Sequence, residues 1–76
     1  MNAGDRVYYL YTDKNGTEIK YAAIILAQQD EGYLIRIGSY DVHTREIKTL
    51  ESIAPAASLE PRSIPCSYEN ELNGRA

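Results

Sequence analysis

Short runs of β-forming residues, separated by turn signals at hairpin spacing, constrain the fold of this chain more than any other feature of its sequence. The first run covers residues 6–12 and leads to Asn15-Gly16, which favours a tight hairpin because both residues tolerate a positive φ. The second run, residues 21–27, is apolar on both faces, as in a central strand. A helix competes there because Ala and Leu favour helices, but the β-branched pair Ile24-Ile25 favours a strand.

The rest of the chain continues this pattern. Gly38-Ser39 allows a bulge or a sharp bend, and Pro61 restricts the last strand to an edge of the sheet. A turn is expected at 29–32 and a strand at 33–37, and residues 40–43 either extend this strand or form the tip of the following loop. A weaker strand at 44–53, a turn or 3₁₀ turn at 54–58 and a closing strand at 59–61 complete the prediction. The sequence therefore predicts an all-β fold, a small five-stranded antiparallel barrel with a 3₁₀ turn before the last strand.

One domain is expected, over residues 1–61, followed by a polar tail at 62–76 that is extended or disordered. Within this tail, Ile64 and Tyr68 are the residues able to dock on the barrel. A chain of 76 residues buries only about 60% of the surface that its unfolded form exposes. Tight closure of the sheet or assembly into a homo-oligomer would therefore add to its stability.

Charge and hydropathy disfavour several classes of partner. The net charge is −3 and the positive residues are scattered along the chain, which disfavours binding to nucleic acid because phosphates require a concentrated basic face. No apolar run reaches membrane-spanning length, and the N-terminus lacks the pattern of a signal peptide. We therefore expect no membrane partner and a cytoplasmic location.

The sequence carries no catalytic, cofactor-binding or metal-binding signature. His43 is the only histidine and Cys66 the only cysteine, so neither a disulfide within the chain nor a zinc site of the usual composition is expected. We interpret His43 as a solvated loop residue and Cys66 as a reduced thiol without a role. The glycines stand singly at turns and form no phosphate-binding loop. These observations predict a protein that acts by binding and is not an enzyme.

All seven aromatic residues are tyrosines, since the chain has no Phe and no Trp. A tyrosine ring buries apolar surface, and its hydroxyl needs a hydrogen-bond partner when it is buried. Several of these rings must fill the core, and Tyr33 together with one of Tyr8 and Tyr9 is expected there. The other rings suit a surface where apolar groups meet water.

Four segments follow one another in an order and spacing typical of one barrel class: Gly4-Asp5-Arg6-Val7, Tyr21-Ala22-Ala23-Ile24-Ile25, the stretch from Tyr33 to Tyr40, and the stretch from Ile53 to Pro61. Over residues 4–61 the chain resembles the SH3-like barrels, and the Tudor group most closely. Tudor domains that bind methylated Arg or Lys hold the cation in a cage of four aromatic rings. By this resemblance the cage positions fall on Tyr11, Tyr21, Ile37 and Tyr40, of which three are aromatic.

A second family resembles the chain at Gly4-Asp5-Arg6-Val7, Glu31-Gly32-Tyr33 and residues 55–60: the type II, plasmid-borne dihydrofolate reductases, which are tetrameric SH3-like barrels. Their pore is lined by a Val-Gln-Ile-Tyr stretch before the proline. Here that stretch reads Glu51-Ser52-Ile53-Ala54, so only Ile53 matches. This resemblance supports the barrel and argues against the reductase activity.

Three hypotheses follow for the function. The preferred one is a non-catalytic module that binds a protein or peptide partner, or a cationic side chain, in a groove lined by Tyr11, Tyr21, Ile37 and Tyr40. The second is a homo-oligomer with a central cleft or pore for a small molecule. The third is a nucleic-acid-associated module, which the acidic balance disfavours.

Overall fold

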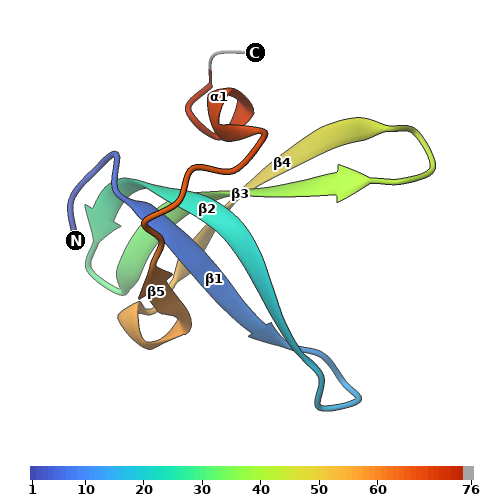
Figure 1. The fold of residues 1–76 in the computed structure, drawn as a ribbon. Coiled ribbons are helices and arrows are strands. Elements are labelled where there is room, and N and C mark those ends of the chain that lie inside the picture. Colours follow the sequence, from blue (N-terminus) through green and yellow to red (C-terminus); the bar gives the residue numbers. More distant parts are fainter. Residues whose placement is uncertain (75–76) are drawn as a thin grey trace.

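The computed structural model describes residues 1–74, which form one curved, five-stranded antiparallel sheet with a short helical segment on one face (Figure 1). The elements are β1 (Arg6–Thr12), β2 (Glu18–Gln29), β3 (Gly32–Asp41), β4 (Glu46–Ala54), the 3₁₀ turn η1 (Ala56–Ser58), β5 (Leu59–Pro61) and α1 (Glu69–Leu72). The strand order is β4-β3-β2-β1-β5, so β4 and β5 are the two edges. The predicted fold class is confirmed, including the 3₁₀ turn before the last strand.

The first hairpin forms as its sequence predicts. Gly16 has a φ of +83° and donates its backbone N–H to the carbonyl of Asp13. The Asp13 carboxylate accepts hydrogen bonds from the backbone N–H groups of Asn15 and Thr17, at 2.9 Å each. The turn therefore satisfies its own polar groups and sets the register in which Tyr9 lies opposite Tyr21.

Strand β2 is buried on both faces, which explains its continuous apolar run. On one face, Ala23 and Ile25 belong to the main core. On the other face, Ala22 and Ile24 pack with Leu72 of α1 in a second cluster. The main core consists of Val7, Ala23, Ile25, Ile35, Ala54 and Leu59, with Tyr9, Tyr33 and Ile37 packed against it.

The bulge of the sheet lies in β2 and not at Gly38-Ser39, where the sequence suggested a bulge or bend. The register of β2 against β3 shifts between Ile25 and Ala27, whereas β3 pairs with β4 without a shift. Beyond Ile37, β3 continues with β4 as its only partner. The β1–β2 and β3–β4 hairpins consequently diverge toward their tips (Figure 1).

Gly38 serves close packing. A Cβ atom at this position would lie 2.7 Å from Leu72 Cδ2 and 2.7 Å from Tyr68 Cε2. Only a glycine lets these two side chains approach the sheet this closely. Position 38 is therefore a glycine because Tyr68 and Leu72, in the segment that follows β5, pack directly against it.

That segment departs from the extended or disordered tail that the sequence predicts. Residues 62–74 turn back across the sheet, and Leu72 of α1 is fully buried against β2 (Figure 1). Of the two residues expected to dock, Tyr68 packs in this second cluster, but Ile64 is 72% exposed. The sequence of this segment is mostly polar, and only a few of its side chains, such as Leu72 and Tyr68, pack against the sheet. Composition alone therefore did not predict the docking.

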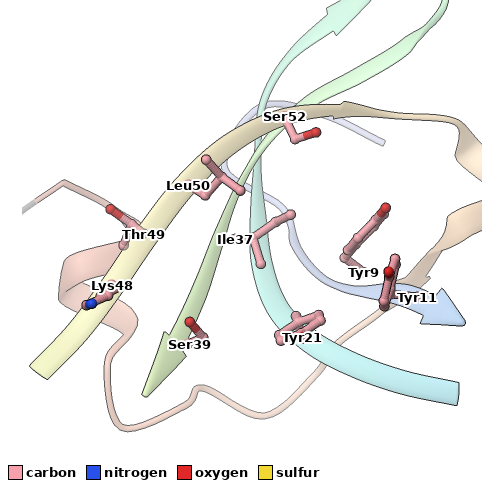
Figure 2. Close-up of a pocket in the computed structure, with 9 residues that line it drawn as sticks. All are labelled: Tyr9, Tyr11, Tyr21, Ile37, Ser39, Lys48, Thr49, Leu50 and Ser52. Atoms are coloured by element: carbon pink, nitrogen blue, oxygen red, sulfur yellow. The ribbon is translucent and has the colours of Figure 1, made fainter. Parts of the chain in front are cut away.

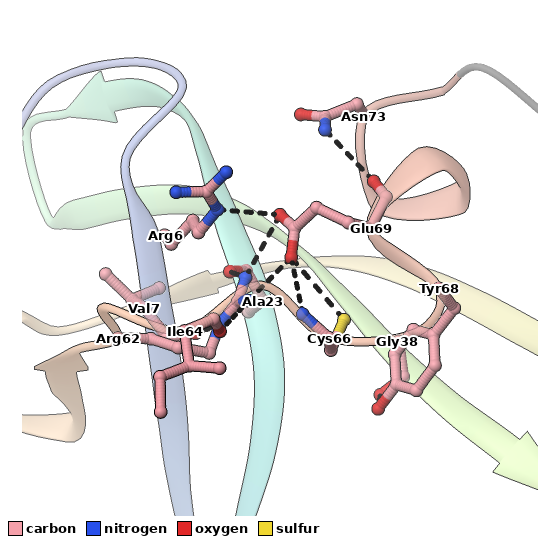
Figure 3. Close-up of polar contacts among 10 residues, drawn as sticks. All are labelled: Arg6, Val7, Ala23, Gly38, Arg62, Ile64, Cys66, Tyr68, Glu69 and Asn73. Atoms are coloured by element: carbon pink, nitrogen blue, oxygen red, sulfur yellow. Dashed lines mark hydrogen bonds and ion pairs between the residues drawn. The ribbon is translucent and has the colours of Figure 1, made fainter.

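Arg62 connects residues 62–74 to the sheet by hydrogen bonds and an ion pair (Figure 3). Its side chain is buried and donates hydrogen bonds to the carbonyls of Val7 (3.1 Å) and Ala23 (2.8 Å). Its guanidinium also pairs with the Glu69 carboxylate at 2.6 Å. The same carboxylate lies 3.5 Å from Arg6 Nε and accepts the backbone N–H of Cys66. A buried guanidinium needs such partners, because leaving it unpaired costs several kcal/mol.

We expect Glu69→Gln to destabilise the protein at neutral pH by about 2–3 kcal/mol, because it leaves Arg62 buried without its counter-charge. The Arg62 hydrogen bond is the largest influence that lowers the pKa of Glu69 from 4.5 to about 2. A depressed carboxylate pKa stabilises the folded state above about pH 4.5, and this contribution is lost as the pH falls through 2. Chemical denaturation measured between these pH values should show a flatter pH dependence for the variant.

The matched control for this measurement is Glu71→Gln, in the same helix. The structure shows no ion pair for Glu71 among residues 1–74, so the same loss of charge should leave the free energy of unfolding nearly unchanged. Equal effects of the two substitutions would contradict the role assigned to the Arg62–Glu69 pair.

We expect Gly38→Ala to displace residues 66–74 from the sheet, because the new methyl group would overlap Leu72 and Tyr68. The loss of stability should be about 1–3 kcal/mol, as for other over-packed sites. Urea denaturation measures it, and amide NMR shifts should change in α1 while β1 and β5 keep theirs. Ser39→Ala, one position along on the opposite face, is the control and should change stability by less than about 0.5 kcal/mol.

Candidate functional site: a tyrosine-lined groove

An open groove of about 460 Å³ lies between the two diverging hairpins (Figure 2). It begins where the main core ends, at Tyr9 and Ile37, which pack against the core and also line the groove. Its lining is Tyr9, Tyr11, Tyr21, Ile37, Ser39, Lys48, Thr49, Leu50 and Ser52, from strands β1 to β4. The groove is thus the part of the concave face that the small core leaves unfilled.

Three tyrosines form one wall of the groove. Tyr9 and Tyr11 lie on the same face of β1 because side chains alternate along a strand, and Tyr21 stands directly across from Tyr9 on β2. Figure 2 shows the three rings close together at the β1–β2 side. Tyr11 is 44% exposed, so this wall offers a large apolar surface to solvent.

The opposite wall comes from β3 and β4. Ile37 pairs with Leu50 and Ser39 pairs with Lys48, so each pair presents its side chains on the same face. Leu50 is 67% exposed, which is unusual for a leucine in the middle of a strand. Ser52 adds a hydroxyl at the end nearer the core.

Lys48 is the only charged residue among those that line the groove within the described chain. Its ammonium lies 3.1 Å from the Asp41 carboxylate, beside the β3–β4 turn. The bond from Lys48 is the first cause that lowers the pKa of Asp41, followed by backbone hydrogen bonds from His43 and Thr44. Lys48 therefore has an acidic partner at the groove edge.

Of the four residues singled out from the sequence, the structure brings Tyr11, Tyr21 and Ile37 together in the groove. Tyr40 is not with them. It is 53% exposed and lies on the other face of β3, because it is three residues from Ile37 and side chains alternate along a strand. Ser39 takes the place expected for Tyr40. The resemblance assigned Tyr40 to the fourth cage position and took no account of the alternation of side chains along β3 beyond Ile37.

Besides Ser39, five residues that line the groove were not expected from the sequence: Tyr9, Lys48, Thr49, Leu50 and Ser52. Strand alternation already placed Tyr9 on the same face as Tyr11, so that signal was present. The residues of β4 gave no signal, because the register of β4 against β3 fixes their position and no motif marks it.

The remaining tyrosines divide as expected for the core. Tyr9 is the member of the adjacent pair that packs against the main core, and Tyr33 packs there too. Tyr8 lies on the other face of β1, where Lys20 Nζ is 5.8 Å and Arg62 Cζ 6.0 Å from the centre of its ring. Its ring therefore takes part in holding the C-terminal segment and not in the groove.

Within residues 1–74 no three His, Cys, Asp or Glu side chains gather as a metal site requires, and no helix is long and apolar enough to cross a bilayer. His43 lies exposed in the β3–β4 turn. Burial raises the pKa of the Cys66 thiol, which is the opposite of what an activated nucleophile needs.

Comparisons of this chain with protein-family models, with curated proteins and with solved structures found no match. The resemblance to SH3-like barrels and to the Tudor group therefore stays a prediction from the sequence.

We expect Lys48→Met to raise the pKa of Asp41 toward its ordinary value, because it removes the largest influence that lowers this pKa. The backbone bonds from His43 and Thr44 should keep part of the depression. NMR titration of the Asp41 carboxyl carbon measures the change. Lys14→Met, in the other hairpin turn, removes the same charge and should leave the pKa of Asp41 unaltered.

Proposed function

We propose that this protein is a non-catalytic interaction module that binds a peptide segment in the tyrosine-lined groove. The observation that carries the proposal is the convergence of Tyr9, Tyr11 and Tyr21 on one wall, opposite the exposed Leu50. Tyrosine supplies contact area at a small cost in side-chain entropy, because it has only two rotatable bonds. An open groove between two hairpins suits an extended segment better than a compact small molecule.

The polar groups of the groove support the same conclusion. Ser39, Ser52 and the tyrosine hydroxyls line an otherwise apolar surface, so they can pair with peptide N–H and C=O groups. A few polar groups on an apolar lining provide orientation, while the apolar area provides affinity.

The charge of the groove favours a neutral or acidic peptide over a methylated lysine or arginine. Ile37 stands where a fourth cage ring would be needed, and the one charged lining residue, Lys48, is basic, although the Asp41 carboxylate beside it offsets part of its charge. Tyr40, the other expected cage residue, faces away from the groove. The cationic ligand implied by the Tudor resemblance is therefore the less favoured version of this proposal, and a neutral or acidic peptide is the favoured one.

The architecture is consistent with the resemblance that suggested a binding module. The closing strand β5 and the 3₁₀ turn before it are elements that the resemblance to SH3-like barrels led us to expect. This agreement concerns the arrangement of strands and supports the proposal only indirectly, because one fold serves many functions.

The test is an NMR titration of the ¹⁵N-labelled protein with short capped peptides of three kinds: neutral aliphatic, acidic, and bearing trimethyl-lysine. We expect the neutral or acidic peptide to shift the amides of Tyr9, Tyr21, Ser39 and Leu50. Tyr11→Ala should weaken this binding about tenfold, as truncation of an aromatic contact commonly does.

Tyr40→Ala is the matched control, because Tyr40 is also an exposed strand tyrosine but lies on the opposite face. It should leave the affinity unchanged. Absence of groove shifts with all three peptides at millimolar concentration would refute the proposal. Shifts with trimethyl-lysine alone would show that the cationic version is correct.

A further inference from the structure

The two edges of the sheet differ sharply. β5 is only three residues long and ends at Pro61, which has no N–H to donate. Such features protect an edge from pairing with another chain. β4 has nine residues and no proline, and residues 48–51 in its middle are all exposed. No segment within residues 1–74 pairs with its outer side.

Two of the three charged residues of β4 do not protect its free edge, and the third, Glu46, stands at the first position of the strand beside the turn. Lys48 is drawn toward β3 by Asp41, and Glu51 toward β3 by Arg36 at 3.3 Å. Both charges thus have partners on the neighbouring strand of the same molecule. The edge that remains is flanked by apolar side chains, of which Leu50 is 67% and Ile53 is 53% exposed.

The sequence of β4 is complementary to itself in one register. When two copies of an edge strand pair around a two-fold axis normal to the sheet, facing residues must come from the same face, so the axis passes through a residue pair. With the axis at Leu50, all nine residues find a partner, from Glu46 opposite Ala54 to Ala54 opposite Glu46. Leu50 then faces Leu50, and Ile47 faces Ile53.

Neighbouring registers are less favourable. An axis at Lys48 or at Glu51 places two like charges directly opposite each other, which is destabilising. An axis at Thr49 places Ile47 opposite Glu51 and Lys48 opposite Leu50. The register centred on Leu50 puts every charged residue opposite a small or neutral one: Glu46 opposite Ala54, Lys48 opposite Ser52 and Glu51 opposite Thr49.

We propose that a second copy of this chain binds to the β4 edge, in an antiparallel pairing centred on Leu50. The two sheets then form one continuous sheet, and both tyrosine-lined grooves open on the same face because Lys48, Leu50 and Ser52 line each groove next to the shared edge. The contact is limited to one strand from each copy, so the dimer is reversible and depends on protein concentration. This inference goes beyond the peptide-binding proposal and does not depend on it.

Sedimentation equilibrium of the full chain over a range of concentrations tests the dimer. We expect a dimer at high concentration, and Leu50→Lys should weaken it about tenfold or more because it removes the central apolar pair and places two ammonium groups opposite each other. Val42→Lys is the matched control: Val42 is 70% exposed but lies outside β4 in the β3–β4 turn, so dimerisation should persist.

Oxidative cross-linking tests the register. In a Cys66→Ser background, Leu50→Cys should form a disulfide-linked dimer readily, because directly opposed residues of antiparallel strands lie within disulfide reach. Lys48→Cys should not cross-link with itself, since its two copies would lie about 13 Å apart along the strands. It should cross-link when mixed with the Ser52→Cys protein, which supplies the residue that faces it.

A monomer at millimolar concentration would overturn the proposal, as would a dimer that Leu50→Lys leaves unchanged. Cross-linking of Lys48→Cys with itself in preference to Leu50→Cys would also overturn the register. These outcomes are independent of the peptide titration, which can be carried out at concentrations where the protein is monomeric.

Discussion

The burial of β2 on both faces is the constraint on which the rest of this structure depends. A single curved sheet has one concave face in which to collect apolar side chains, and Ala23 and Ile25 use it. Ala22 and Ile24 point the other way and would remain in water without a second cover. The chain solves this with residues 62–74, whose Leu72 completes a small second core. The C-terminal segment is therefore a structural layer and not an appendage.

This second layer is held by electrostatics as much as by apolar contact. A helix of four residues has little stability of its own, since isolated helices need several turns to form in water. The Arg62–Glu69 pair compensates by joining the carbonyls of β1 and β2 to the first residue of α1 (Figure 3). The hydrogen bonds of the buried guanidinium can form only when residues 62–74 lie in one position on the sheet. A purely apolar contact would tolerate several positions.

The strands could be predicted from the sequence, but the second layer could not. Turn chemistry at Asn15-Gly16 and the β-forming run of residues 6–12 placed β1 at its observed bounds, and Pro61 marked the short edge strand β5, because those signals are local. The docking of Arg62 depends on contacts with residues about 40 and 55 positions earlier, for which no local pattern exists. The candidate site divides in the same way. The resemblance to Tudor domains pointed to Tyr11 and Tyr21, whereas Leu50 and Lys48 depend on how β4 lies against β3, which no motif marks.

The order of the two layers along the chain has a consequence for biosynthesis. Every strand precedes residue 62, so a chain emerging from the ribosome can pair its whole sheet before the segment that covers Ala22 and Ile24 has been made. During that interval the outer face of β2 is an exposed apolar surface, of the kind that chaperones recognise and that promotes aggregation. Ala22 contributes only a methyl group and Gly38 no side chain to that surface, which limits its apolar area until Leu72 covers it.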